Sequence, residues 1–285
     1  MLVYAPQEST MELGHQSWST LPSLPPMVLL HGMGGTGALW RPIAASLESH
    51  FRLLAPDQRG HGASQAPQTS YTPQDFGQDV LDTMATTGHH PAWIVGHSMG
   101  ARTAAATAWL RPAWVKGIVL IDIGFSGPAG GGMGDNLYSF LSILPLRFAS
   151  RVEARDFMNT RCPDPSMGQY LMAVARMHGD GSLTFPFDRE ALLRTLEGVR
   201  DSSIRPWLRD LGARGMPVLA LRGGESRVWS RTDYDEERRQ FADLPSIRFE
   251  EIPGTGHGLP FEKRKEFVEL LLRWTGAAPT GSASG

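Results

Sequence analysis

The chain has a single cysteine, Cys162, among its 285 residues. One cysteine excludes an intrachain disulfide and a cysteine-based metal cluster. It lies in the turn-like stretch Thr-Arg-Cys-Pro-Asp-Pro, where an incidental thiol is a better interpretation than a nucleophile. We therefore expect an ordinary hydrophobic core to hold the fold, and an apolar content of 41% is sufficient for one.

Three further absences narrow the class of protein. The sequence has no run of about 18 apolar residues, so no membrane span is predicted. The formal net charge is only −2, which provides no field that would favour nucleic acid as a partner. The N-terminal segment carries Glu8 and Glu12 and lacks a basic and then apolar stretch, so no signal peptide is expected. A cytoplasmic protein is the resulting expectation, and the oligomeric state is left open.

Apolar runs alternate with helix-like segments over much of the chain. Strand-like runs lie at 27–30, 51–55, 93–95, 116–121, 217–221 and 247–252. Helical patterns lie at 42–49, 72–88, 99–110 and 260–274. This alternation predicts an α/β fold with a mostly parallel central sheet and helices on both faces.

The alternation breaks between residues 124 and 212. A segment with six glycines, 124–134, is followed by helical patterns at 136–144, 166–177 and 189–199 without an obvious strand. We interpret 124–212 as a helical cap over the carboxyl edge of the sheet, where open α/β sheets bind ligands. The core is then 1–123 and 213–275, and the small, polar tail 276–285 is expected to be disordered.

The most informative stretch is Ala92-Trp-Ile-Val-Gly96-His97-Ser98-Met99-Gly100. A strand-like run leads into Gly-x-Ser-x-Gly, and a helical segment follows at once. That context is typical of a nucleophile elbow, in which a sharp turn presents the serine at the end of the sheet. Glycines fit there because the turn brings backbone close to backbone. Ser98 is therefore the candidate nucleophile.

A serine needs a base to take its proton. His257, in Pro-Gly-Thr-Gly-His257-Gly, follows the run 247–252 and precedes the last helix, so its loop can reach the mouth of the sheet. The other histidines have weaker contexts. His61 is expected to hold a turn, and His97 is expected to face away from Ser98.

The segment His31-Gly32-Met33-Gly34-Gly35 follows the first buried run. Gly32-x-Gly34-x-x-Gly37 also matches a dinucleotide-binding pattern, with Asp57 near the distance of its acidic residue. That alternative leaves Ser98 and His257 unexplained. We therefore favour an oxyanion loop, in which the N–H groups of Met33 and Met99 converge on the developing negative charge.

Four motifs then occur in one order: His31-Gly32, Asp57-Gln-Arg-Gly-His-Gly62, Gly96-His-Ser-Met-Gly100 and Gly256-His257. In this the sequence resembles the α/β-hydrolase superfamily over about residues 25–122 and 213–275. The resemblance implies a serine hydrolase fold with Ser98 as nucleophile and His257 as base. It also implies that Asp57 shapes a turn beside the site.

The chain departs from this family at the third member of the triad. The family commonly carries the acid in a loop after the strand at 217–221, but Arg227 occupies the aspartate position of that loop here. Asp122, at the end of the run 116–121, is our first candidate, because some members of the superfamily carry their acid there. Glu225 is the alternative, and a pairing with Arg227 would argue against it.

The predicted function is that of a cap-bearing, carboxylesterase-like serine hydrolase that acts on a mainly apolar small-molecule acyl substrate, with no metal or organic cofactor. The substrate-binding residues predicted are His31, Gly32, Tyr138, Phe140 and Phe187. Arg147, Arg151, Arg155 and Arg161 are interpreted as a solvated helix face, with contact to an anionic group as the alternative. Other reactions remain open on the same fold, namely carbon–carbon bond hydrolysis, thioester or lactone cleavage and cofactor-free oxygenation, as does non-catalytic ligand binding.

Overall fold

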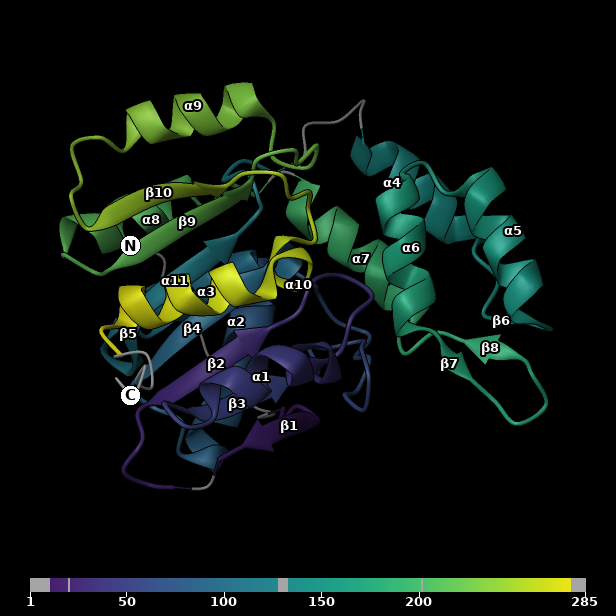
Figure 1. The fold of residues 1–285 in the computed structure, drawn as a ribbon, viewed down its shortest axis with the longest axis horizontal. Coiled ribbons are helices and arrows are strands. Elements are labelled where there is room, and N and C mark those ends of the chain that lie inside the picture. The colour runs from purple at the N-terminus through teal and green to yellow at the C-terminus, as the bar shows by residue number, and fades with distance from the viewer. Residues whose placement is uncertain (1–10, 20, 128–132, 201, 278–285) are drawn as a thin grey trace, which may run out of the picture.

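The computed structural model describes residues 11–19, 21–127, 133–200 and 202–277. Within them, seven strands form one sheet in the order β1-β3-β2-β4-β5-β9-β10 (Figure 1). The strands are β1 His15–Trp18, β2 Pro26–Leu30, β3 Arg52–Pro56, β4 Ala92–His97, β5 Val115–Ile121, β9 Val218–Gly223 and β10 Ile247–Ile252. Only the β1–β3 pair among these neighbours is antiparallel. The predicted α/β fold with a mostly parallel sheet is therefore confirmed.

Helices cover both faces of this sheet, which is why its inner strands are apolar throughout. Met27 and Leu29 of β2 face one layer, formed by α1 (Arg41–Leu47) and α11 (Arg264–Thr275), which lies in front of the strands in Figure 1. Val28 and Leu30 face the opposite layer. That layer consists of α2 Pro73–Thr87, α3 Met99–Leu110, α8 Arg205–Ala213 and α9 Arg231–Gln240.

The start and end of α2 follow from its sequence. Thr72 accepts a hydrogen bond from the N–H of Asp75, and the Asp75 carboxylate accepts one from the N–H of Thr72. This reciprocal cap satisfies two of the donors that a helix start leaves free. Gly88 ends the helix in the left-handed region, with φ 68°. Phe76, Val80 and Met84 are buried at four-residue spacing, as the sequence predicted.

The segment between β5 and α8 forms a separate group of elements beside the sheet, to the right in Figure 1. Its described elements are α4 Met133–Ile143, β6 Arg147–Phe148, α5 Arg151–Arg161, α6 Pro165–Val174, β7 Arg176–Met177, β8 Leu183–Thr184 and α7 Arg189–Arg200. Phe140, Phe148 and Leu171 belong to its own hydrophobic cluster. The segment is mainly helical, but β6, β8 and β7, which the sequence did not predict, pair in a small antiparallel sheet. Strands of two residues are too short to leave a pattern in a sequence.

Two other boundaries differ from those drawn on the sequence. α8 lies on the sheet, since Leu208 and Leu211 join the cluster of the strands and Trp207 stacks on Trp109 of α3 at 5.3 Å. We therefore propose that the cap ends near residue 200 rather than 212. The closing helix is divided into α10 (Leu259–Glu262) and α11, because the backbone between them, at Lys263, is not helical. Residues 128–132 of the glycine-rich segment and 278–285 of the tail lie outside the described residues.

None of the described helices combines the length and the apolar character that crossing a lipid bilayer requires.

Candidate active site

Ser98 lies at the sharp turn between β4 and α3. Its φ is positive, with φ 54° and ψ −119°, a costly conformation for a residue that carries a Cβ. The flanking glycines are required by close contacts. A Cβ on Gly96 would lie 2.1 Å from the carbonyl oxygen of Gly100, and one on Gly100 would lie 2.4 Å from that of Leu30. The turn has the geometry that the sequence predicted for a nucleophile elbow.

The loop after β2 lies against this elbow. A Cβ on Gly32 would lie 3.3 Å from the Cβ of Ser98, so the backbone of the loop passes next to the serine. Met33 and Met99 both border the space in front of Ser98. Met99 also begins α3, and the start of a helix favours negative charge. The two methionines named for the oxyanion hole are therefore brought to the same cavity as the serine.

The same loop has hydrogen bonds that argue against a phosphate cradle. The N–H of Gly34 donates to Nε2 of His61 at 3.0 Å, and the N–H of Gly37 donates to Oδ1 of Asp57 at 2.7 Å. Asp57 also accepts from the N–H of Ala63 at 2.9 Å through Oδ2. The N–H groups of two glycines of the dinucleotide pattern thus donate to protein side chains. Asp57 accepts hydrogen bonds from both the loop after β2 and its own turn, and so links them.

His31 lies beneath the loop instead of facing a ligand. Its Nδ1–H donates to the carbonyl of Gly32 at 2.8 Å, and its Nε2 accepts from the N–H of Gln58 at 3.0 Å. Burial lowers the pKa of His31 to about 4 and that of His61 to about 3. Both rings are therefore neutral near pH 7. They fix the backbone of the loop that passes Ser98.

His257 reaches the site from the loop after β10. Its Nδ1 lies 2.7 Å from Oδ2 of Asp122, which follows β5 and is fully buried. Asp122 also accepts from the N–H of Gly223 at 2.9 Å through Oδ1, and from the hydroxyl of Ser226 through Oδ2. Hydrogen bonds to an ionised acceptor are stronger than neutral ones. The carboxylate is thus held by donors from β9, from the loop after it and from the histidine.

This contact has a consequence for the histidine ring. When Nδ1–H of the neutral ring donates to Asp122, Nε2 carries the lone pair. Glu225, the alternative acid, is exposed, and no hydrogen bond or ion pair joins its carboxylate to His257 in the described part of the chain. Of the two acids left open by the sequence, Asp122 is the one that the structure places against the imidazole.

His97 is buried beside His257, a contact that the sequence did not predict. Its Nε2–H donates to the main-chain carbonyl of His257 at 2.8 Å, and the two ring centroids are 4.7 Å apart. Burial, and then the neighbouring His257, lower the pKa of His97 to about 3, so the ring is neutral. Its Nδ1 is buried without a hydrogen-bond partner in the described chain. His97 therefore supports the loop that carries His257.

Two cavities meet at Ser98. One has a volume of about 380 Å³ and extends toward Tyr170 and Phe261. The other has a volume of about 410 Å³ and extends toward Arg102 and Trp229. The residues that border both are Met33, Ser98, Leu137, Met167, Val228 and His257. The shared wall combines the candidate nucleophile and base with four apolar side chains.

Of the predicted substrate-binding residues, Gly32 lines the first cavity. Phe140 is 2% exposed within the cluster of the cap. The hydroxyl of Tyr138 donates to Glu197 at 3.3 Å, and Phe187 stacks on Phe185 at 5.3 Å. Neither these three residues nor His31 are among the described residues that line the two cavities.

Sequence reasoning missed Ser226, whose hydroxyl supports Asp122. The sequence did offer an indication of this residue. In the loop after the strand at 217–221, the serine that the family carries is retained as Ser226, although the aspartate that follows it is replaced by Arg227. Within the described residues, no group of three or more histidine, cysteine, aspartate or glutamate side chains is arranged to hold a metal ion.

Comparisons with known proteins bear on the family and the fold of the chain. A model of the alpha/beta hydrolase family matches residues 27–270. The 2-(acetamidomethylene)succinate hydrolase of Mesorhizobium japonicum is 29% identical over 82% of this chain and 81% of that protein. The sn-1-specific diacylglycerol lipase of Mus musculus is 26% identical over 87% of this chain and 80% of the lipase. A solved structure of a marine microorganism esterase superimposes with a TM-score of 0.77, at 21% identity, over 93% of this chain and 99% of the esterase.

Proposed function

Because the chain belongs to the alpha/beta hydrolase family, we propose that it is a serine hydrolase that cleaves carboxylic ester or related acyl bonds through an acyl-enzyme. The observation that carries the proposal is the contact of 2.7 Å between Nδ1 of His257 and the buried carboxylate of Asp122, beside a serine on a strained turn. A nucleophile, a base and a group that orients the base are the three parts that acyl transfer needs.

The proposed reaction begins when Oγ of Ser98 attacks the substrate carbonyl carbon and its proton passes to Nε2 of His257. Asp122 holds the ring in the tautomer that can take this proton and stabilises the positive charge that results. The tetrahedral intermediate collapses, the bond to the leaving group breaks, and His257 returns the proton to that group. Water then attacks the acyl-enzyme with the same proton transfers and releases the acid.

The negative charge on the carbonyl oxygen is assigned to the N–H groups of Met33 and Met99. Support comes from the approach of the Gly32 backbone to Ser98 and from the position of Met99 at the start of α3. Donors that are fixed before the reaction lower its barrier most effectively, since they need no reorganisation. The hydrogen bonds from Gly34 and Gly37 to side chains keep this loop in place.

We further propose that the substrate is mainly apolar and has two arms. The two cavities meet at Ser98, so one can receive the acyl chain and the other the leaving group. Met33, Leu137, Met167 and Val228 border both and would contact the substrate next to the carbonyl. The name of the mouse relative, a diacylglycerol lipase, supports an ester as the substrate.

The test is hydrolysis of p-nitrophenyl acyl esters of increasing chain length. We expect turnover by the native chain and its loss in Ser98→Ala. Ser142→Ala, which alters an exposed serine on α4 of the cap, is the matched control and is expected to keep full activity. The acyl chain length of the ester that gives the highest kcat/KM indicates how long an acyl group the cavity accommodates.

A fluorophosphonate probe gives an independent readout, since it reacts with activated serines whatever the substrate. Intact mass should show one adduct on the native chain and none on Ser98→Ala. No adduct on a folded native chain, together with no turnover of esters, thioesters or lactones, would reject the serine mechanism. Non-catalytic ligand binding or cofactor-free oxygenation on the same fold would then be the better explanation.

A further inference from the structure

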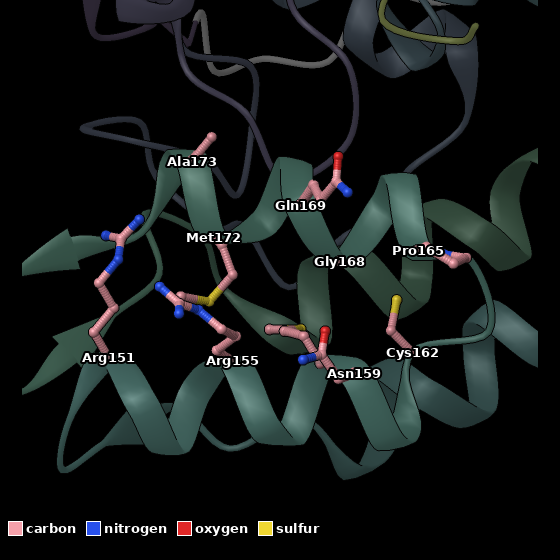
Figure 2. Close-up of a pocket in the computed structure, with 10 residues that line it drawn as sticks. Arg151, Arg155, Asn159, Cys162, Pro165, Gly168, Gln169, Met172 and Ala173 are labelled. Carbon is pink, nitrogen blue, oxygen red and sulfur yellow. The ribbon is translucent and has the colours of Figure 1, made fainter.

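The cap contains a third cavity, of about 460 Å³, between α5 and α6 (Figure 2). It does not reach Ser98, but it is close to the site. Gln169 and Ala173 of α6 line both this cavity and the first cavity at Ser98. Both side chains point away from α5 in Figure 2. One helix therefore separates the third cavity from the candidate active site.

The cavity is narrow at one end and wide at the other. At the narrow end, a Cβ on Gly168 would lie 3.4 Å from the Cβ of Met158 and 3.6 Å from that of Cys162, so the helices touch there. At the wide end, Arg151 and Arg155 rise from α5 toward α6, and Met172 points from α6 into the space between the helices (Figure 2). Both arginines line the cavity and are exposed.

Arg151 and Arg155 lie one helical turn apart, an arrangement in which like charges repel and destabilise the helix. No ion pair joins either of them to a carboxylate in the described chain. Arg147, which precedes α5, differs because it pairs with Asp180 at 2.5 Å. The carboxylate of Glu153, also on α5, accepts a hydrogen bond from the N–H of Ala149 at 2.7 Å. An anion between the two guanidinium groups would replace their repulsion with attraction.

The inner part of the cavity has a different character. Met158 is 4% exposed, and Met172 points into the same space, so the two methionines give this part of the cavity an apolar surface. Methionine side chains adapt readily to the shape of an apolar ligand. A ligand that fits the whole cavity must therefore combine an anionic group with an apolar stretch.

We propose that this cavity binds an amphipathic oxyanion, a molecule with a carboxylate or phosphate group and an apolar chain. The oxyanion lies between Arg151 and Arg155, since guanidinium groups bind carboxylate and phosphate with paired hydrogen bonds. The apolar chain lies along Met158 and Met172. The volume falls within the range of small-molecule sites, which is about 300–1,000 Å³. The site is separate from the serine chemistry and does not depend on it.

The experiment is isothermal titration calorimetry of the full chain with decanoate and with decyl phosphate. Decanol serves as the uncharged probe. The double variant Arg151→Gln with Arg155→Gln is expected to weaken binding of both anions by about tenfold or more. The loss of even one hydrogen bond to a charged group lowers affinity by about that factor. Arg151→Lys with Arg155→Lys keeps the charges and should keep part of the affinity. The ratio of the two anion affinities tells which oxyanion the site prefers.

Arg161→Gln is the matched control, since Arg161 ends the same helix, is exposed and does not line the cavity. It is expected to bind the anions as the native chain does. Three results would overturn the proposal: no binding of either anion, equal affinity for decanol, or anion binding that survives in the double glutamine variant. The last result would assign the anion to the cavities at Ser98. Melting temperatures of all variants check that each is folded.

Discussion

Replacement of Asp122 by asparagine tests the proposed site most directly. The carboxylate accepts hydrogen bonds from His257, Gly223 and Ser226, and all three partners are donors. An asparagine of the same shape offers one acceptor oxygen and an NH2 group that can only donate. The NH2 group must then face a donor. If it faces His257, the ring shifts its proton to Nε2 and can no longer accept the proton of Ser98.

The size of the expected fall in kcat follows from this change in the tautomer of His257. Replacement of a triad aspartate by asparagine costs about 10⁴ in kcat, which is about 5.4 kcal/mol of transition-state stabilisation. KM should change little, because Asp122 does not border the cavities. Stability should fall by about 1–3 kcal/mol, since a buried donor is left unsatisfied. Steady-state kinetics on a p-nitrophenyl ester, well below the melting temperature of both proteins, measures the effect.

Glu225→Gln is the control for this prediction, because Glu225 is an exposed carboxylate in the neighbouring loop. It is expected to keep native activity. The reasoning is refuted if Asp122→Asn stays within about tenfold of the native kcat, a loss far below that of a true triad acid. A large loss in Glu225→Gln would instead transfer the role to that residue.

Three further predictions concern the residues around the site. Gly96→Ala brings a Cβ to 2.1 Å from a carbonyl oxygen of the elbow, so thermal unfolding should show a loss of about 3 kcal/mol or more; Gly179→Ala, with no atom within 4 Å of the new Cβ, is the control and should unfold like the native chain. His97→Phe removes the donor to the main chain of His257, the proposed base, so kcat should fall more than KM changes, and His97→Gln, which keeps an N–H donor, should recover part of it; equal activity of both variants with the native chain would contradict a positioning role. The buried rings of His31 and His61 stay neutral to about pH 4 and 3, whereas in the unfolded chain they take up protons below about pH 6.5. The free energy of unfolding should therefore fall as the pH drops from 6.5 toward 4, by up to about 1.4 kcal/mol per histidine per pH unit, and denaturant titrations at pH 7 and pH 5 that agree would refute this.

The arginines of the cap show how far a charge pattern can be interpreted from sequence. Four arginines at 147, 151, 155 and 161 read as a solvated helix face. In the structure all four arginines are exposed, as that interpretation expects, but Arg147 pairs with Asp180, and Arg151 and Arg155 also line a cavity. The difference depends on α6, which packs against α5 and supplies the opposite wall, and no spacing within α5 could reveal that wall.

The cap was also where the sequence was least informative about secondary structure. α5 was not predicted, since only Ala154 and Met158 of its eleven residues are buried and the helix shows little apolar periodicity. The small sheet of β6, β8 and β7 has strands of two residues. Phe140 was expected to meet substrate but packs inside the cap. An apolar side chain on a helix looks the same in sequence whether it faces a core or a cavity.

The sequence by itself determined the alternating strands and helices, the glycine-framed elbow at Ser98 and the order of the motifs, because each depends on local periodicity and on close backbone contacts within a few residues. The choice between Asp122 and Glu225 depended on tertiary structure. Pairing of Ile121 with Leu221 brings the ends of β5 and β9 together, so that the buried Asp122 accepts from Gly223 and meets His257, 135 positions later in the chain. Only the register of the parallel strands, whose carboxyl ends share one edge, decides which of two carboxylates reaches an imidazole.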